Sequence, residues 1–181
     1  MNVPNALSIL RLVMIPVFVL TLFSGSPNAG YYAAAVFLAA ELTDILDGYI
    51  ARKYDQITKL GRFLDPLADK LMKAAAMVCL AILGVIPVWA VVLLFVKEFL
   101  MLCGGLLFYR RESDIPPSNV FGKAAEFFLC ALVLAHILFA IPEAVSLILW
   151  CAALAAEYLA MVIYAARTVK RLQAKEEPHE N

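Results

Sequence analysis

Six long apolar segments constrain the fold of this chain more than any other feature of its sequence. They cover residues 7–23, 31–50, 65–83, 87–109, 120–139 and 144–166. A helix of about 20 apolar residues spans the hydrocarbon core of a bilayer, and these Leu- and Ala-rich segments lack the period-2 alternation of barrel strands. The chain is 64% hydrophobic and 17% charged, whereas soluble domains are about 45–50% apolar and about 25% charged. We therefore predict an all-α integral membrane protein with six transmembrane helices, the first capped by Asn5 or Ser8.

The basic residues are distributed unevenly between the connections. Residues 24–30, 84–86 and 140–143 contain no Lys or Arg, whereas the other connections and the C-terminal segment do. The positive-inside rule then predicts that both termini, and the connection between the second and third helices, are cytoplasmic. A membrane domain over residues 1–168 is expected to be followed by a polar cytoplasmic tail over residues 169–181. The 15 basic and 15 acidic residues leave no net charge, so nothing global indicates binding to nucleic acid.

Two pairs of aspartates lie at the cytoplasmic ends of the second and third predicted helices. Asp44 and Asp47 are three residues apart and Asp65 and Asp69 are four apart, so each pair shares one helix face. Converging carboxylates repel one another unless cations intervene, and oxygen ligands of this kind suit Mg²⁺ or Mn²⁺. We predict that the four aspartates hold two such ions, as in sites for phosphoryl transfer. The alternative is that they only pair with the nearby basic residues Arg52, Lys53, Arg62 and Lys70.

Small residues and one arginine accompany the aspartates. Gly48 and Ala51 lie on or beside the first carboxylate face, where short side chains let a ligand approach the backbone, and Gly61 offers the same at the end of the connection. The guanidinium of Arg52 suits a diphosphate, because its planar fork can donate two parallel hydrogen bonds.

These residues form one string, Asp44-x2-Asp47-Gly48-x2-Ala51-Arg52-x8-Gly61-x3-Asp65-x3-Asp69. The string resembles the signature of the CDP-alcohol phosphotransferase family, with every fixed position filled. Residues 3–8 followed by Arg11, and residues 61–70, are similar to the phosphatidylglycerophosphate synthase and cardiolipin synthase branches of that family. In length and in number of spans, the resemblance covers essentially the whole chain.

The resemblance implies that a phosphatidyl group passes from CDP-diacylglycerol to an alcohol and that CMP leaves. It implies that the four aspartates hold the metal and that Asp69 is also the catalytic base toward the acceptor hydroxyl. The residues implied at the CDP site are Gly48, Ala51, Arg52 and Gly61. It also suggests a homodimer packed through membrane helices. The expected location is the cell (plasma) membrane, with several spans and with the active site facing the cytoplasm.

The acceptor is less strongly indicated by the sequence. Glycerol 3-phosphate is a dianion and needs a cationic subsite, for which the candidates are Lys97, Arg110, Arg111 and Lys123. Lys97 precedes Glu98 where phosphatidylglycerophosphate synthases usually carry Arg-Glu, and Lys123 lies in a Gly-Lys pair similar to theirs. The alternatives are an ion pair of Lys97 with Glu98 or Glu126 inside the membrane, and membrane anchoring for the two arginines.

The leading hypothesis is therefore a glycerol-3-phosphate 3-phosphatidyltransferase of phospholipid biosynthesis that forms phosphatidylglycerophosphate. A cardiolipin synthase that uses phosphatidylglycerol is the alternative within the same chemistry. A small transporter is an alternative of another class, because acids inside a membrane also mark ion routes. The clustering of the acids toward one membrane face argues against transport.

Overall fold

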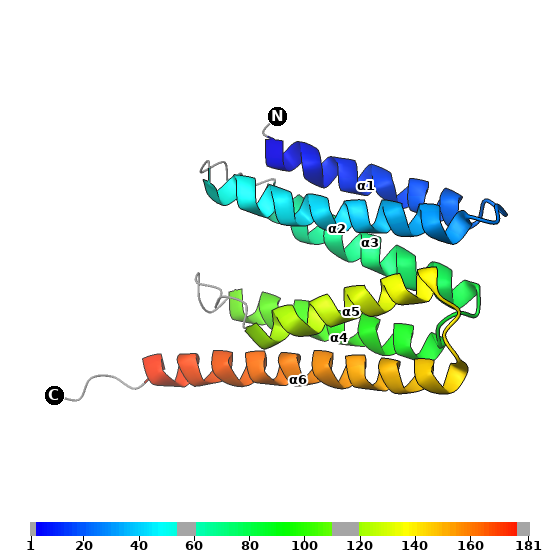
Figure 1. Ribbon diagram of the computed structural model, residues 1–181. Helices are drawn as coiled ribbons and strands as arrows, with labels where there is room; N and C mark the ends of the chain where they lie inside the picture. The colour runs from blue at the N-terminus through cyan, green and yellow to red at the C-terminus, as the bar shows by residue number, and fades with distance from the viewer. Residues whose placement is uncertain (1–2, 54–60, 110–119, 177–181) are drawn as a thin grey trace. The chain divides into compact units, whose positions relative to one another are not determined.

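The computed structural model describes residues 3–53, 61–109 and 120–176, and these residues form six helices and no strand (Figure 1). The helices are α1 (Val3–Leu22), α2 (Ala29–Lys53), α3 (Gly61–Ile82), α4 (Val88–Tyr109), α5 (Val120–Leu138) and α6 (Glu143–Glu176). Each of the six apolar segments therefore lies in a helix of its own, so the all-helical prediction is confirmed for the described residues.

Four of the helices are long and apolar enough to cross a bilayer. The spans that qualify by length and composition are Asn5–Leu22, Val88–Gly105, Val120–Leu138 and Glu143–Lys170. The remaining two, α2 and α3, carry the aspartates of the motif. A multi-pass membrane protein is thus supported, while the count of six spans and the cytoplasmic termini stay predictions.

Two helix ends differ from the sequence-based expectation. Helix α1 begins at Val3, before both proposed caps, so Asn5 and Ser8 lie inside the helix and are buried. The cap prediction is therefore wrong. Helix α6 continues to Glu176, into the predicted tail, through residues that are mostly strong helix formers such as Arg, Leu, Gln, Ala and Lys.

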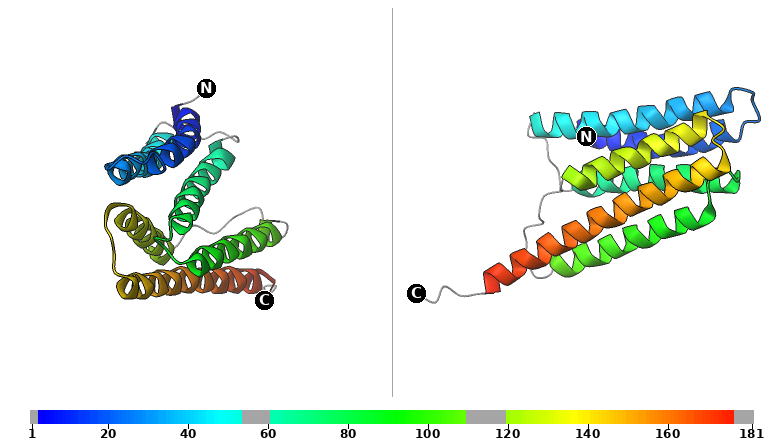
Figure 2. Two further views of the ribbon diagram at one scale, coloured as in Figure 1. Left: turned by 90° about the vertical axis from the view of Figure 1, so that its right-hand side faces the viewer. Right: turned by 60° about the horizontal axis from the view of Figure 1, so that its bottom comes forward.

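Contacts divide the chain into two compact units, which we describe separately. The first consists of Met1–Ile86 and Leu132–Ile141. In this unit α1 packs against both α2 and α3 (Figure 1, Figure 2). The rings of Phe18 in α1 and Phe37 in α2 are 6.2 Å apart and tilted, which is a favourable geometry for an aromatic pair. Small buried side chains allow the helix backbones to approach closely; they are Ala33, Ala34, Ala40, Ala68 and Ala76.

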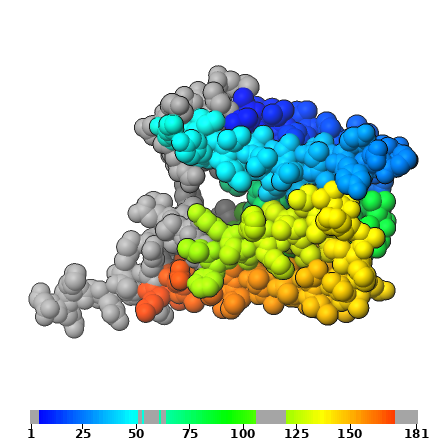
Figure 3. All heavy atoms as spheres, in the orientation of Figure 1, coloured from blue at the N-terminus to red at the C-terminus, as the bar shows by residue number. Residues whose placement is uncertain are grey.

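Atoms of α2 are open along the helix (Figure 3), and the exposed large side chains of this helix are apolar. Its large exposed side chains are Tyr31, Tyr32, Leu38, Leu42, Ile45, Leu46 and Tyr49. An exposed apolar surface of this extent marks a site of contact with a membrane or another protein. Apolar side chains that face outward are therefore consistent with a chain surrounded by lipid.

The second unit consists of Pro87–Ala131 and Pro142–Asn181. Here α4 packs against α6, and the Tyr158 hydroxyl of α6 donates a 2.9 Å hydrogen bond to the carbonyl oxygen of Leu93 in α4. Trp150 of α6 is fully buried, so its large side chain contributes to the apolar area that is removed from solvent on folding.

A close backbone approach in the first unit generates a stability prediction. A Cβ added at Gly30 in α2 would lie 2.8 Å from the backbone oxygen of Ile137, and backbone cannot move aside as a flexible side chain can. We expect Gly30→Ala to lower the free energy of unfolding by about 1–3 kcal/mol, measured by thermal unfolding in detergent. Gly104→Ala in α4 is the matched control, because a Cβ there meets nothing within 4 Å and Ala favours helix. Equal melting temperatures for the two variants would contradict the prediction.

Candidate active site

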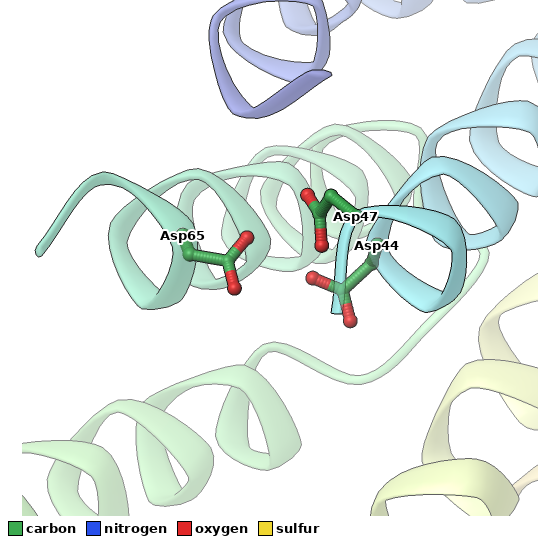
Figure 4. A group of neighbouring side chains, drawn as sticks. All are labelled: Asp44, Asp47 and Asp65. Carbon is green, nitrogen blue, oxygen red and sulfur yellow. The ribbon is translucent and has the colours of Figure 1, made fainter. Parts of the chain in front are cut away.

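Three of the four predicted metal-binding aspartates meet in the first unit. Asp44 and Asp47 project from α2 and face Asp65 of α3 (Figure 4). One carboxylate oxygen from each residue lies within 4.8 Å of the other two. Asp47 is buried at 2% exposure, whereas Asp44 and Asp65 are each a little more than one third exposed. The cluster therefore has one buried and two partly open members.

The local structure explains why these carboxylates meet. Residues three apart on a helix share one face, so the helical turn from Asp44 to Asp47 directs both toward α3. Asp65 lies in the first turns of α3, which begins at Gly61. Helix α1 packs against both helices and thereby holds the two carboxylate-bearing segments together. The connection over residues 54–60 lies outside the described residues.

Arg11 of α1 pairs with all three carboxylates. Its Nη1 atom lies 2.7 Å from Oδ1 of Asp44 and 3.4 Å from Oδ1 of Asp65, and its Nη2 atom lies 2.6 Å from Oδ2 of Asp47. The Ser8 hydroxyl, one turn earlier, donates a 3.4 Å hydrogen bond to the same oxygen of Asp65. Arg11 is itself only 1% exposed. A buried guanidinium therefore offsets part of the negative charge of the cluster.

Arg11 was not predicted to take part in the site, although the sequence contains a signal for such a role. Arg11 is the only charged residue of α1, and a lone ionisable group in an apolar span indicates function or a buried partner. The alternative set of partners for the aspartates was Arg52, Lys53, Arg62 and Lys70. Of these, Lys53 lies over the ring of Tyr49, and the side chains of Arg52 and Arg62 lie outside the described residues.

The donor set fits a divalent cation. Three carboxylates are the oxygen ligands that Mg²⁺ and Mn²⁺ prefer. Within the described part of the chain, Oδ1 of Asp47 is buried and has no hydrogen-bond partner. An orphaned buried carboxylate oxygen is costly, and a metal ion beside it would remove that cost. The cluster could thus hold such an ion.

Asp69 lies one turn beyond Asp65 in α3 and is not part of the three-carboxylate cluster. Because it is four residues after Asp65, it lies on the same face of α3. Its Oδ1 atom is 2.8 Å from the Nζ atom of Lys73, four residues later in the same helix. Lys73 is buried and was not identified from the sequence. The ion pair with Lys73 restrains the Asp69 carboxylate, which lies outside the three-carboxylate cluster.

The predicted CDP-binding residues are only partly described. Gly48 is half-buried and directly follows Asp47 in α2, and Gly61 is half-buried at the start of α3. Ala51 and Arg52 belong to the last turns of α2, but their side chains lie outside the described residues. Gly48 thus directly follows a residue of the cluster in α2, and Gly61 lies one turn before Asp65 in α3, while the role of all four residues stays a prediction.

The two described residues of the predicted acceptor subsite, Lys97 and Lys123, lie in the second unit. Lys97 of α4 is buried, with its Nζ atom 2.7 Å from Oε1 of Glu98 and 2.8 Å from Oε2 of Glu157. Lys97 thus pairs with Glu98, which is one of its two expected partners, and also with Glu157 of α6. Lys123 is exposed in the first turn of α5. Arg110 and Arg111 lie outside the described residues.

The Lys97–Glu157 pair leads to a second prediction. Glu157 is 2% exposed, so Lys97→Met leaves a buried carboxylate without its cation, which costs about 3–5 kcal/mol. We expect the double variant Lys97→Met/Glu157→Gln to recover most of this loss, because it removes the orphaned charge. Lys123→Met, at an exposed lysine, should change stability by less than about 0.5 kcal/mol. Unfolding in detergent measures all three variants, and no recovery in the double variant would contradict the prediction.

Known proteins resemble the chain over most of its length. The sequence profile of the CDP-alcohol phosphatidyltransferase family matches residues 1–166. A probable phosphatidylglycerophosphate synthase of Mycobacterium tuberculosis is 40% identical over 129 residues, which cover 70% of this chain and 61% of that protein. The CDP-diacylglycerol–glycerol-3-phosphate 3-phosphatidyltransferase of Bacillus subtilis is 32% identical over 153 residues, covering 78% and 79%.

A relative with another name matches to a similar degree. The cardiolipin synthase (CMP-forming) of Streptomyces coelicolor is 37% identical over 134 residues, covering 71% of this chain and 61% of that protein. The chain thus spans less than two thirds of the mycobacterial and streptomycete proteins. These relatives carry different names, but one family profile covers all six apolar segments and the whole aspartate motif of this chain. The chain belongs to the CDP-alcohol phosphatidyltransferase family.

Proposed function

We propose that the chain transfers the phosphatidyl group of CDP-diacylglycerol to glycerol 3-phosphate, which releases CMP and forms phosphatidylglycerophosphate. The observation that carries this proposal is the meeting of Asp44, Asp47 and Asp65 from two helices, with ligand oxygens within 4.8 Å of one another. The Bacillus relative named for this reaction supports the choice of substrates, because its match extends over 78% of this chain.

Asp69 is the base in the proposed reaction. The acceptor hydroxyl oxygen forms a bond to the β-phosphorus of CDP-diacylglycerol, the bond from that phosphorus to the bridging oxygen breaks, and CMP leaves with the oxygen. The hydroxyl proton passes to the Asp69 carboxylate, which must come within hydrogen-bond reach of it. The ion pair with Lys73 at 2.8 Å restricts where this carboxylate can lie and so orients it for the proton.

Asp44, Asp47 and Asp65, with Asp69 as a further ligand, would hold Mg²⁺ or Mn²⁺, in keeping with the two ions expected from the sequence. Bound there, a divalent cation would neutralise the diphosphate and the charge that develops on the departing CMP. Gly48 and Gly61 leave space for the nucleotide beside the carboxylates. Ala51 and Arg52 complete the proposed CDP site, where the arginine fork suits the diphosphate.

Four basic residues remain the proposed acceptor subsite: Lys97, Arg110, Arg111 and Lys123. The pairing of Lys97 with two carboxylates means that a phosphate must compete with Glu98 and Glu157 for this ammonium. A phosphorylated acceptor is therefore expected to depend more on the other three residues.

Cardiolipin synthesis is the second candidate function. The Streptomyces relative of that name matches the chain at 37% identity, and its acceptor would be phosphatidylglycerol in place of glycerol 3-phosphate. Both reactions use the same donor and release the same nucleotide. A transporter is less well supported, because three of the four acids of the motif form one cluster where α2 and α3 meet, and the fourth, Asp69, lies one turn beyond Asp65.

The proposed location is the cell membrane, with the carboxylate cluster on the cytoplasmic side. The water-soluble head of the donor and its two acyl chains require a site at the membrane surface. The homodimer suggested by the resemblance, and the boundary between a membrane domain over residues 1–168 and a tail over residues 169–181, stay predictions.

An assay of CMP release tests the proposed function. Purified protein receives CDP-diacylglycerol, Mg²⁺ or Mn²⁺, and either glycerol 3-phosphate or phosphatidylglycerol. We expect CMP only with glycerol 3-phosphate, and none after chelation of the metal, with recovery when metal is added back. Release only with phosphatidylglycerol would instead identify a cardiolipin synthase, and no release with any alcohol would contradict the enzyme proposal.

The role of Asp69 yields a separate prediction. Asp69→Asn removes the proton acceptor at nearly constant volume and should lower the rate of CMP release about 100- to 10,000-fold, the usual contribution of a general base. The melting temperature is expected to fall, because the buried Lys73 loses its ion pair with Asp69, so the rate is measured at a temperature at which the variant is folded. Glu143→Gln, at an exposed acid in the first turn of α6, is the matched control and should keep full activity. Retained activity in Asp69→Asn would assign the base to another residue.

A further inference from the structure

The side chain of Arg11 forms ion pairs with three carboxylates. It lies in α1, which packs against α2 and α3, and it reaches Asp44 and Asp47 of the first helix and Asp65 of the second. Among the described residues, these three ion pairs link α1 to both carboxylate-bearing helices. A change at Arg11 therefore alters the cluster as a whole.

The geometry of the contacts leaves ligand oxygens available. Arg11 contacts Oδ2 of Asp47 at 2.6 Å, while Oδ1 of the same residue is buried and has no hydrogen-bond partner within the described chain. It contacts Oδ1 of Asp44 at 2.7 Å and Oδ1 of Asp65 at 3.4 Å. The guanidinium thus binds one oxygen of each carboxylate, and at Asp47 it fixes the direction of the other.

The charge balance of the cluster also leaves room for a cation. With all three carboxylates ionised, the cluster and the guanidinium together carry two negative charges, which one divalent ion would balance. The neighbouring Asp69 has its own cation in Lys73. Arg11 therefore reduces the electrostatic repulsion between the carboxylates but neutralises only part of their negative charge.

We infer that Arg11 is a positioning residue for divalent-cation binding, which acts by holding one oxygen of Asp44, Asp47 and Asp65 and thereby orienting the carboxylates toward the ion. This inference rests on the proposed function, because it assumes that the cluster holds a metal. Hydrogen-bonding groups that orient metal ligands commonly change metal affinity 10- to 100-fold when they are removed.

Two other roles for Arg11 predict different results. If Arg11 merely occupied the place of a metal ion, its removal would take away a competing positive charge, and the metal would bind more tightly. If Arg11 only held the helices together, its removal would lower the melting temperature while folded protein kept its metal affinity. The direction of the change in affinity therefore distinguishes the three roles.

The test measures Mn²⁺ binding to the purified full chain by electron paramagnetic resonance, without substrate. We expect Arg11→Gln to weaken binding about 10- to 100-fold. Arg11→Lys should weaken it by a smaller factor, because an ammonium keeps the charge but lacks the planar fork that reaches three carboxylates. Arg167→Gln and Arg167→Lys, at an exposed arginine of α6, are the matched controls and should bind Mn²⁺ like the unaltered chain.

Activity and stability are recorded on the same samples. The metal concentration that gives half-maximal CMP release should rise by the factor found for binding, with activity restored at saturating metal in Arg11→Lys. If Arg11→Gln fails to fold, the Arg11→Lys variant decides the result alone. Tighter or unchanged Mn²⁺ binding in the folded variant overturns the inference and leaves the proposed function intact. Absence of Mn²⁺ binding by the unaltered chain overturns both the inference and the metal part of the proposed function.

Discussion

Three carboxylates and one buried guanidinium form the interaction on which the candidate site depends. Asp44, Asp47 and Asp65 would repel one another at this separation, and Arg11 offsets that repulsion from α1. Arg11 is only 1% exposed. Its guanidinium therefore requires close carboxylate partners, because a charge removed from water is stable only when it is well paired. The contacts between α1, α2 and α3 and the construction of the site are therefore coupled.

Small side chains in the first unit allow the helices to pack closely enough for these ion pairs to form. Buried alanines in α2 and α3 allow close helix contact, which brings the carboxylates within reach of one side chain. The second unit also contains a buried ion-pair network, in which Lys97 of α4 pairs with Glu98 of the same helix and with Glu157 of α6. In both units, buried charges join helices whose outward surfaces are largely apolar.

Much of the fold and part of the site follow from local patterns. The six apolar segments predict the six helices, because length and composition alone decide whether a segment can span a bilayer. The spacing of Asp44 and Asp47 predicts a shared face for the same local reason. The cap at Asn5 or Ser8 was wrong, because α1 already begins at Val3, and the Ser8 hydroxyl donates to Asp65, 57 residues away. No local pattern contains that information.

The sequence by itself determined the family, the helices and the aspartates that form the candidate metal site, because each depends on residue types at short, fixed spacings. Only the tertiary structure decided which cations these acids have as partners. Arg11 lies 36 residues before Asp47, and Glu157 is far from Lys97 along the chain. Such pairs depend on which helix faces meet, and that is set by the packing of whole helices against one another.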